Sequence, residues 1–268
     1  MTYPTSLGVS TPTQIRLLGQ DLSEDLIGSV GFGELAFWLV ALRRPSPSET
    51  RLFEACLVAL ADHGFTPTAI AARLTYLSAP DALQGALAAG LLGGGSRFLG
   101  VTEDTGAFLA EALAEARASD ALPEPDADDA AWDALAVEAV ERQTATGSRV
   151  PGLGHHLHKQ RDPRVARLYA VAQEEHLVGP HLRLFAAVGR VAGTTLGKDL
   201  PLNGAGAVGA ALADLGLPVE LLRGFALLAR TAGLLGHLAE ETRHPIAGRI
   251  FAAVEDEAEY VPPEPPEA

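Results

Sequence analysis

The 268-residue sequence contains a single cysteine, Cys56, and few of the β-branched and aromatic side chains that fill β-strands. A lone cysteine excludes an intrachain disulfide framework and fits a reducing compartment. Because Cys56 lies in an apolar stretch with Phe53 and Leu57, we interpret it as a buried small side chain rather than a catalytic thiol. Ala, Leu and Gly dominate the hydrophobic residues, which predicts helices packed closely through small side chains.

The sequence also lacks a basic block and a long apolar run. Its net charge is −14, which argues against a surface that follows the phosphates of a nucleic acid. No window reaches the roughly 18 apolar residues of a membrane span, and residues 1–20 have no apolar core of signal-peptide type. We therefore expect a cytoplasmic protein that binds neither nucleic acid nor a membrane. Local basic residues can still bind a small anion inside an acidic protein.

Turn and capping residues divide the chain into helices after an irregular arm at residues 1–20. Ser46-Pro47, Thr66-Pro67 and Asp162-Pro163 are typical helix entries, with a capping side chain followed by proline at the first helical position. Residues 122–129, rich in proline and acidic side chains, predict a linker. The expected helices cover residues 34–40, 46–62, 66–77, 81–92, 105–117, 130–144, 163–175, 179–191, 204–215, 218–241 and 246–254. Gly206 and Gly209 indicate close helix contact, since the chain has no glycine-rich nucleotide-binding motif.

Ionisable groups are concentrated in residues 152–164. Gly152 and Gly154 permit close approach of the backbone to a ligand, and His155 follows them directly. Arg164 lies in the first turn of the helix that Asp162 caps, where a cation opposes the helix dipole and indicates an anion or a function that offsets it. Neighbouring cations favour a neutral histidine, which suits a base or a hydrogen-bond donor.

A metal site is the alternative use of the three histidines, His155, His156 and His158. No carboxylate trio or thiolate lies near them in the sequence, and the adjacent cations would repel a divalent ion. We therefore expect no metal.

Residues 152–164 resemble the Gly-x-Gly-His…Asp-Pro-Arg motif of the citrate synthase superfamily. Asp62-His63-Gly64 resembles the family's Asp-His element, and residues 229–233, followed by His237, resemble its Ser-Arg-x-x-Gly helix. Residues 33–39 resemble an early helix of that family. Three further stretches, residues 90–98, 202–206 and 255–261, are similar to the citryl-CoA lyase branch, which includes the C-terminal lyase module of ATP-citrate lyase. The resemblance covers roughly residues 25–262.

The resemblance implies an all-α, citrate-synthase-like fold. A large helical domain, residues 1–103 and 213–268, is accompanied by a smaller helical domain, residues 104–212, that closes over the active site. It also implies a homodimer or higher homo-oligomer and cleavage of a 3-hydroxy acyl-CoA such as citryl-CoA to acetyl-CoA and oxaloacetate. No cofactor is implied, because the coenzyme A thioester is itself the substrate.

The resemblance also assigns roles to individual residues. His155 would be the catalytic residue that hydrogen-bonds the substrate hydroxyl. The residues implied to bind the substrate carboxylates are His63, Arg164, Arg230 and Arg243. Coenzyme A would contact Val150, Gly152, Gly154 and Lys159.

Two positions depart from the family pattern. Phe98 stands where synthases have a catalytic histidine, a change that the lyase branch shares. Ala205 stands where the family has its catalytic aspartate, and an alanine cannot exchange the proton of the acetyl methyl; Glu103 and Asp104 are candidate substitutes. A citrate or methylcitrate synthase-like condensing enzyme, or a catalytically impaired acyl-CoA and tricarboxylate-binding protein, therefore remain as alternatives.

Overall fold

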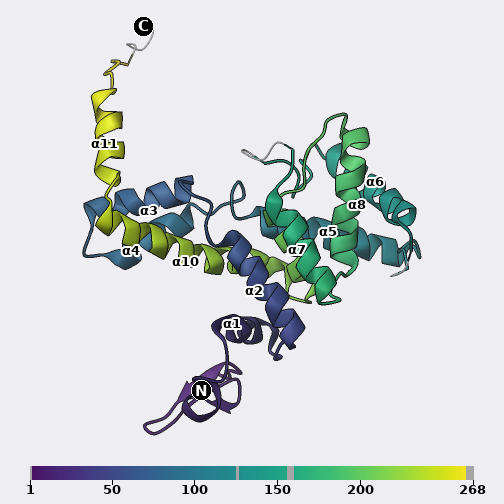
Figure 1. Ribbon diagram of the computed structural model, residues 1–268, viewed down its shortest axis with the longest axis horizontal. Coiled ribbons are helices and arrows are strands. Elements are labelled where there is room, and N and C mark those ends of the chain that lie inside the picture. Colours follow the sequence, from purple (N-terminus) through teal and green to yellow (C-terminus); the bar gives the residue numbers. More distant parts are fainter. Residues whose placement is uncertain (1, 125–126, 156–159, 264–268) are drawn as a thin grey trace. The chain divides into compact units, whose positions relative to one another are not determined.

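The computed structural model describes residues 2–124, 127–155 and 160–263, and within them the regular structure is helical apart from one small sheet (Figure 1). The elements are β1 (Gly8–Ser10), β2 (Ile15–Leu17), β3 (Gln20–Asp21), the π-helix η1 (Leu22–Leu26), α1 (Phe32–Ala41), α2 (Pro47–Ala61), α3 (Pro67–Ser78), α4 (Leu83–Leu92), α5 (Val101–Ala118), α6 (Asp129–Ala145), α7 (Pro163–Glu174), α8 (Pro180–Leu196), α9 (Gly204–Asp214), the 3-10 helix η2 (Val219–Leu221), α10 (Leu222–Arg243) and α11 (Ala247–Asp256). The all-α class expected from the sequence is confirmed.

The chain divides into two compact units. Unit 1 comprises Met1–Leu60 and Ser96–Ala226, and unit 2 comprises Ala61–Gly95 and Leu227–Ala268. These boundaries differ from those of the domains expected from the sequence, residues 1–103 with 213–268 and residues 104–212, and that domain division stays a prediction.

In unit 1, helices α5, α6, α8 and α9 pack against one another around a core of small and aliphatic side chains. Glycine permits the closest crossing, since a Cβ on Gly209 of α9 would lie 2.2 Å from the carbonyl oxygen of Thr102 in α5. The expected close helix contact at Gly209 is thus confirmed. Helix α2 joins the same unit through Phe53, whose ring packs edge-on against Phe37 of α1 and Phe225.

The N-terminal arm contains a small antiparallel sheet in the order β1-β2-β3, where the sequence predicted irregular structure. Its strands are only two or three residues long and mostly exposed, so no alternation of apolar and polar residues marks them. Leu18 and Gly19 form the turn between β2 and β3, both with positive φ. A sheet of this size rests on backbone pairing and a few local side-chain bonds, such as that from Gln14 Nε2 to Asp21, which composition does not reveal.

In unit 2, helices α3, α4 and α10 share a core built from alanine and leucine (Figure 1). Ala69 and Ala72 of α3, Ala86 of α4, and Leu234 and Leu238 of α10 are buried together. Helix α11 contacts α3. This core fixes α10, the helix that carries Arg230 and His237.

The predicted helix entries are confirmed by their hydrogen bonds. Ser46 Oγ accepts from the backbone N of Glu49 while the Glu49 carboxylate accepts from the backbone N of Ser46, a reciprocal capping box. Thr66 caps α3 and Asp162 caps α7, each followed by proline in the first turn. Cys56 is buried, and burial raises the pKa of its thiol to about 12, which fits the structural role inferred for it.

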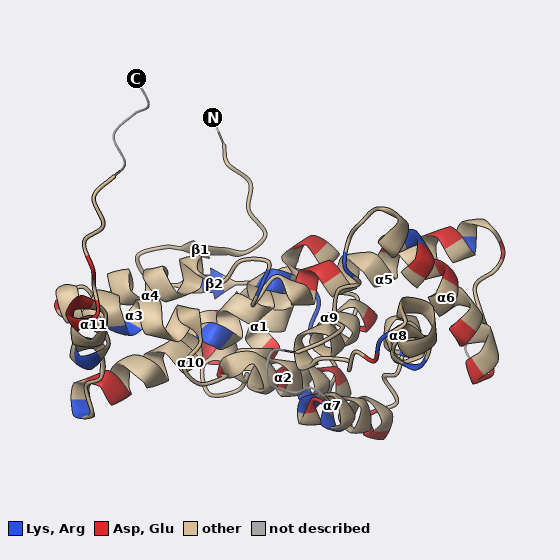
Figure 2. Ribbon diagram, turned by 90° about the horizontal axis from the view of Figure 1, so that it is seen from above, with Lys and Arg blue, Asp and Glu red and all other residues tan. Residues whose placement is uncertain are grey.

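No helix in the described part of the chain is long and apolar enough to cross a membrane. Basic and acidic residues are interspersed along helices such as α7 and α10 (Figure 2).

Candidate functional site

The loop that leads to His155 is held by a short antiparallel pairing with residues 201–203. Gly154 N donates to the carbonyl of Pro201 at 2.7 Å, and Asn203 N donates to the carbonyl of Gly152 at 2.9 Å. The Asn203 side chain adds a bond from Nδ2 to the carbonyl of Gly154 at 2.9 Å. Hydrogen bonds to residues 201–203 therefore hold the backbone at Gly152 and Gly154, directly before His155.

Both glycines of this loop are favoured by its conformation. Gly152 and Gly154 have φ values of +82° and +77°, in the left-handed region that favours glycine. A Cβ on Gly152 would also lie 2.6 Å from the Phe185 ring. The half-buried His155 thus sits at the end of a loop whose backbone favours glycine at both positions, and the sequence interpretation of these glycines as close-approach positions agrees with the geometry at Gly152.

Arg164 is oriented by Asp162, two residues before it. The buried Asp162 carboxylate accepts from Arg164 Nε at 3.0 Å, from Nη2 at 2.7 Å and from the backbone N of Arg164 at 3.1 Å. A fourth bond comes from Gly204 N at 2.8 Å. Burial acts to raise the pKa of Asp162, but the hydrogen bonds and the Arg164 charge outweigh it and lower that pKa to about 2. Asp162 is therefore a fixed anion rather than a proton carrier.

The bonds to Asp162 occupy one edge of the Arg164 guanidinium, and Nη1 donates to the carbonyl of Ala59 at 3.2 Å. A guanidinium has five N–H donors, and these contacts use three of them. The other two, one on each Nη, remain for a ligand, and a guanidinium can bind a carboxylate with two hydrogen bonds. Arg164, which the sequence predicted to bind a substrate carboxylate, is thus held in one orientation by an internal carboxylate.

The N-terminus of α9 contacts the Asp162–Arg164 ion pair. Asn203 caps α9 by accepting from Gly206 N at 2.9 Å, and Gly204 N contacts Asp162. A Cβ on Gly204 would lie 2.5 Å from Arg164 Nε, so glycine leaves room for the arginine. Ala205 follows directly and presents only a methyl group where the family has its aspartate.

The proposed substitutes for that aspartate are engaged elsewhere in unit 1. Arg223 Nε lies 3.3 Å from the Glu103 carboxylate, and Arg223 Nη2 lies 3.7 Å from that of Asp104. Both acids therefore lie beside the same cation, Arg223.

In unit 2, His63 occupies the turn between α2 and α3. The Asp62 carboxylate accepts from Gly64 N at 2.9 Å, and Gly64 has a φ of +71°. Arg230 of α10 is buried, and its Nη1 lies 3.4 Å from Thr66 Oγ1, the cap of α3. The structure therefore links Arg230 to the residues that follow His63.

The predicted site residues thus fall into two groups. Unit 1 holds Val150, Gly152, Gly154, His155 and Arg164. Hydrogen bonds connect Gly152 and Gly154 directly, and Arg164 through Asp162, to residues 201–204 at the start of α9. Unit 2 holds His63, Arg230 and Arg243, the last of which is exposed at the end of α10. Lys159, His156 and His158 lie outside the described residues.

Sequence reasoning missed three residues that organise these groups. Asn203 and Asp162 hold the His155 loop and Arg164, although Asp162 was expected only as a helix cap. Arg73 is fully buried in α3 and bonds to α10. Its signal was a lone arginine among the apolar residues of an amphipathic helix, because a buried cation requires partners.

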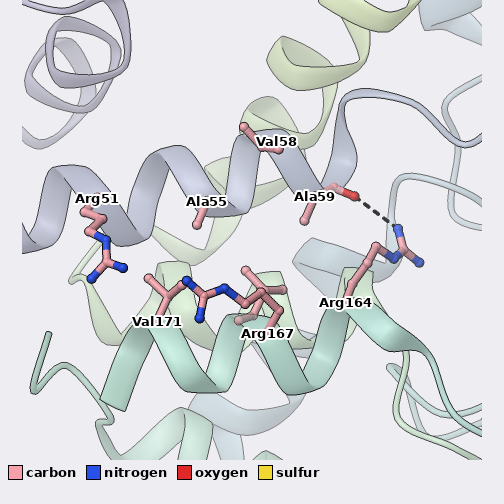
Figure 3. A pocket seen from close by; sticks show the side chains of 8 residues that line it. Arg51, Ala55, Val58, Ala59, Arg164, Arg167 and Val171 are labelled. Carbon is pink, nitrogen blue, oxygen red and sulfur yellow. Dashed lines mark hydrogen bonds between the residues drawn. The ribbon is translucent and has the colours of Figure 1, made fainter. Parts of the chain in front are cut away.

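A groove of about 390 Å³ lies between α2 and α7 in unit 1 (Figure 3). Its lining is apolar with arginines at the rim: Arg51, Ala55, Val58, Ala59, Arg164, Arg167, Leu168 and Val171. Arg51 pairs with Glu174 and Glu175, and Arg167 pairs with Glu174. The groove does not include His155, so it is not the loop site described above. Among the described residues, no group of three or more His, Cys, Asp or Glu side chains is placed to hold a metal ion.

Comparison with known proteins shows which proteins the chain resembles. Citryl-CoA lyase from Hydrogenobacter thermophilus is similar in structure, with 29% sequence identity and a TM-score of 0.82 over 100% of this chain and 98% of that chain. ATP citrate lyase from Methanosaeta concilii, in complex with (3S)-citryl-CoA, shares the fold at 23% identity and a TM-score of 0.72, over 98% of this chain and 42% of that one.

A longer relative matches in sequence as well. ATP-citrate synthase beta chain protein 1 from Oryza sativa subsp. japonica is 28% identical over 210 residues, or 72% of this chain and 32% of that protein. The chain therefore spans about a third of the length of this relative. The family described as citrate synthase, C-terminal domain, matches residues 21–251. The chain belongs to the family of the citrate synthase C-terminal domain.

Proposed function

We propose that this protein is a citryl-CoA lyase-like enzyme that cleaves citryl-CoA, or a similar 3-hydroxy acyl-CoA, to acetyl-CoA and oxaloacetate. The similarity to citryl-CoA lyase extends over nearly the full length of both chains, which supports a reaction of this class. The observation that carries the proposal is the shared anchoring of the His155 loop and Arg164 at the entry of α9, through Asn203 and Gly204.

In this proposal His155 accepts the proton of the substrate's tertiary hydroxyl. The O–H electrons form the carbonyl of oxaloacetate as the carbon–carbon bond breaks, and the bonding pair leaves as the enolate of acetyl-CoA. Hydrogen-bond donors around Ser96 and the three glycines before it, Gly93 to Gly95, stabilise that oxyanion until it takes up a proton. Both carbon fragments and the proton are accounted for without a redox or metal cofactor, and coenzyme A enters as part of the substrate.

Carboxylate binding is assigned to the basic residues that the family resemblance names. We propose that Arg164, His63, Arg230 and Arg243 bind the carboxylates of the citryl group. Arg164 is suited to this by its fixed side chain, since its bonds leave one N–H on each Nη for a second carboxylate. Val150, Gly152, Gly154 and Lys159 would contact coenzyme A.

Ala205 favours cleavage over condensation. Condensation must remove a proton from the acetyl methyl, which requires a positioned base. Cleavage produces the enolate from the alkoxide and needs only a proton donor afterwards, a role that water can fill. The same alanine is the observation behind a second candidate, an acyl-CoA and tricarboxylate-binding protein without turnover.

The purified protein should release acetyl-CoA and oxaloacetate in equal amounts from citryl-CoA, detected by mass spectrometry. His155→Ala should lower kcat/KM by about 10²-fold or more. The control is His176→Asn, because His176 is exposed with a φ of +57° that asparagine adopts readily. Tight binding of coenzyme A without any turnover by the wild-type protein would rule out the lyase and favour the binding protein.

We further propose a cytoplasmic homodimer. The buried Cys56 fits a reducing compartment, and Val58 of α2 and Phe251 and Val254 of α11 are large apolar side chains exposed in the single chain. Light scattering of the eluting protein should give twice the mass of the chain, 27.9 kDa. A mass that stays at one chain at micromolar concentration would refute the dimer.

A further inference from the structure

A buried polar cluster lies in unit 2 around Arg73, whose side chain is fully enclosed. Arg73 Nη1 donates to the Glu241 carboxylate at 2.7 Å, and Nη2 also bonds to Glu240. Its Nε and Nη2 lie 3.2 and 3.0 Å from Nδ1 of His237. The guanidinium stacks over the ring of Phe65 at 5.2 Å. The cluster therefore connects α3 with α10 through charge-assisted hydrogen bonds.

The contacts of Arg73 determine which nitrogen of His237 carries the proton. A guanidinium only donates, so Nδ1 of His237 must accept and the ring hydrogen lies on Nε2. Nε2 lies 2.9 Å from Oδ1 of Asp62. His237 Nε2 therefore donates to the Asp62 carboxylate. The hydrogen bonds from Arg73 to Nδ1 hold the ring in this orientation.

Asp62 also makes a hydrogen bond within the turn that carries His63. Its other oxygen, Oδ2, accepts from the backbone N of Gly64, so His63 lies between two residues that are bonded to each other. Gly233 brings α10 against the same turn, since a Cβ there would lie 1.9 Å from the carbonyl oxygen of Ala61. The hydrogen-bonded chain from Arg73 through His237 and Asp62 to Gly64 is thus continuous.

We propose that Arg73 and His237 are positioning residues for His63: the chain Arg73–His237–Asp62 holds the Asp62-His63-Gly64 turn in the conformation that binds a dicarboxylate. This inference rests on the proposed substrate role of His63. Glu241 extends the same cluster, because its Oε1 accepts from the backbone N of Ile246 and Ala247 and so fixes the segment after Arg243.

A purely structural cluster would stabilise the packing of α3 on α10 without affecting one ligand more than another. If the cluster positions His63, breaking it should instead weaken binding of oxaloacetate selectively and leave coenzyme A affinity unchanged. The substitutions His237→Leu and His237→Gln separate these roles. Leucine removes both hydrogen bonds, whereas a glutamine amide still donates to Asp62 and accepts from Arg73.

The experiment measures the dissociation constants of oxaloacetate and of coenzyme A by calorimetry for both variants, after circular dichroism has shown that each is folded. We expect His237→Leu to weaken oxaloacetate binding about tenfold and coenzyme A binding less than twofold, and His237→Gln to restore most of the oxaloacetate affinity. Glu240→Gln is the control, since half-exposed Glu240 bonds to Arg73 but lies outside the chain to His63. It should bind both ligands like the wild-type protein.

An unchanged oxaloacetate affinity in a folded His237→Leu variant would overturn the inference. Equal losses for the leucine and glutamine variants would also overturn it, because ring shape rather than hydrogen bonding would then be responsible. A wild-type protein that binds no oxaloacetate would refute the role of His63 itself. By contrast, wild-type binding of oxaloacetate without cleavage of citryl-CoA would refute the lyase proposal and leave this inference standing.

Discussion

Asp162 and Arg164 form a two-point ion pair at the first turn of α7, with donor–acceptor distances of 3.0 and 2.7 Å. The same carboxylate binds the backbone N of Gly204, so the pair joins the start of α7 to the start of α9. Because a cation in the first helical turn opposes the helix dipole, the carboxylate offsets a local cost as well as orienting the arginine. The ion pair therefore bears both on stability and on the ligand binding that we propose for Arg164, and each can be tested.

Replacing Asp162 with Asn should lower the free energy of unfolding at pH 7 by about 2 kcal/mol. The carboxyl has a pKa of about 2 in the folded protein, against an ordinary value of 3.8. A depressed folded pKa stabilises above the unfolded pKa, and this contribution disappears as the pH falls from about 4 to about 2.

Urea unfolding of both proteins at several pH values gives the difference in stability. That difference should shrink below pH 4, and a gap that stays constant down to pH 2 would contradict the prediction.

Replacing Arg164 with Lys should raise the KM for citryl-CoA about 10- to 100-fold. A lysine ammonium is a single point charge and cannot bond Asp162 along one edge while presenting a fork to a substrate carboxylate. Steady-state kinetics measures the change. Arg167→Lys is the matched control on the same helix, because Arg167 is exposed and pairs with Glu174. Equal KM values for the two variants would argue against a ligand role for Arg164.

Asn203 performs two tasks that two substitutions separate. Asn203→Asp keeps an oxygen to cap Gly206 N but loses the donor to the Gly154 carbonyl, so kcat/KM should fall about tenfold with little loss of stability. Asn203→Ala loses both bonds and should also destabilise the protein by about 1 kcal/mol. Kinetics and thermal unfolding are measured together. Full activity in the folded aspartate variant would show that the His155 loop does not depend on this bond.

Introducing a carboxylate by Ala205→Asp should accelerate exchange of the acetyl-CoA methyl protons with D₂O by about 10²-fold. The resemblance to the citrate synthase superfamily places a proton-transferring aspartate at this position, which follows the capped entry of α9. Proton NMR of acetyl-CoA in the presence of oxaloacetate follows the exchange, with Ala205→Asn as the uncharged control. Equal exchange rates for the aspartate and asparagine variants would show that position 205 does not face the methyl group.

The sequence indicated those features that depend on neighbours along the chain. The helix starts at Ser46, Thr66 and Asp162 could be predicted because a capping residue and its proline lie within three residues of each other. The segment with His155 and Arg164 was a candidate site because glycines and charged residues stand close together there in the sequence. The bond from Asn203 to Gly154 joins residues 49 positions apart, and that from Arg73 to His237 joins residues 164 apart. Such pairings depend on how helices pack, and periodicity carries no information about them.

The N-terminal sheet escaped prediction for a different reason. Its strands are too short and too exposed for an alternating pattern, and their order follows from backbone hydrogen bonds. Two limits of the compact units, after Leu60 and after Ala226, fall within α2 and α10, where the helical pattern runs on without a break; the third, after Gly95, lies between α4 and α5. Capping and periodicity mark where helices start and end, and neither marks where a compact unit does.

The close approach of Gly204 to Arg164 makes the effects of two neighbouring positions non-additive. The related lyase motif reads Leu-Asn-Val-Asp-Gly where this chain has Leu-Asn-Gly-Ala-Gly at residues 202–206. A valine at 204 would push against a guanidinium that Asp162 already pins. Restoring the aspartate alone and restoring the whole motif are therefore different experiments, and an evolutionary path between the two sequences would have to move the arginine before it could accept the larger residue.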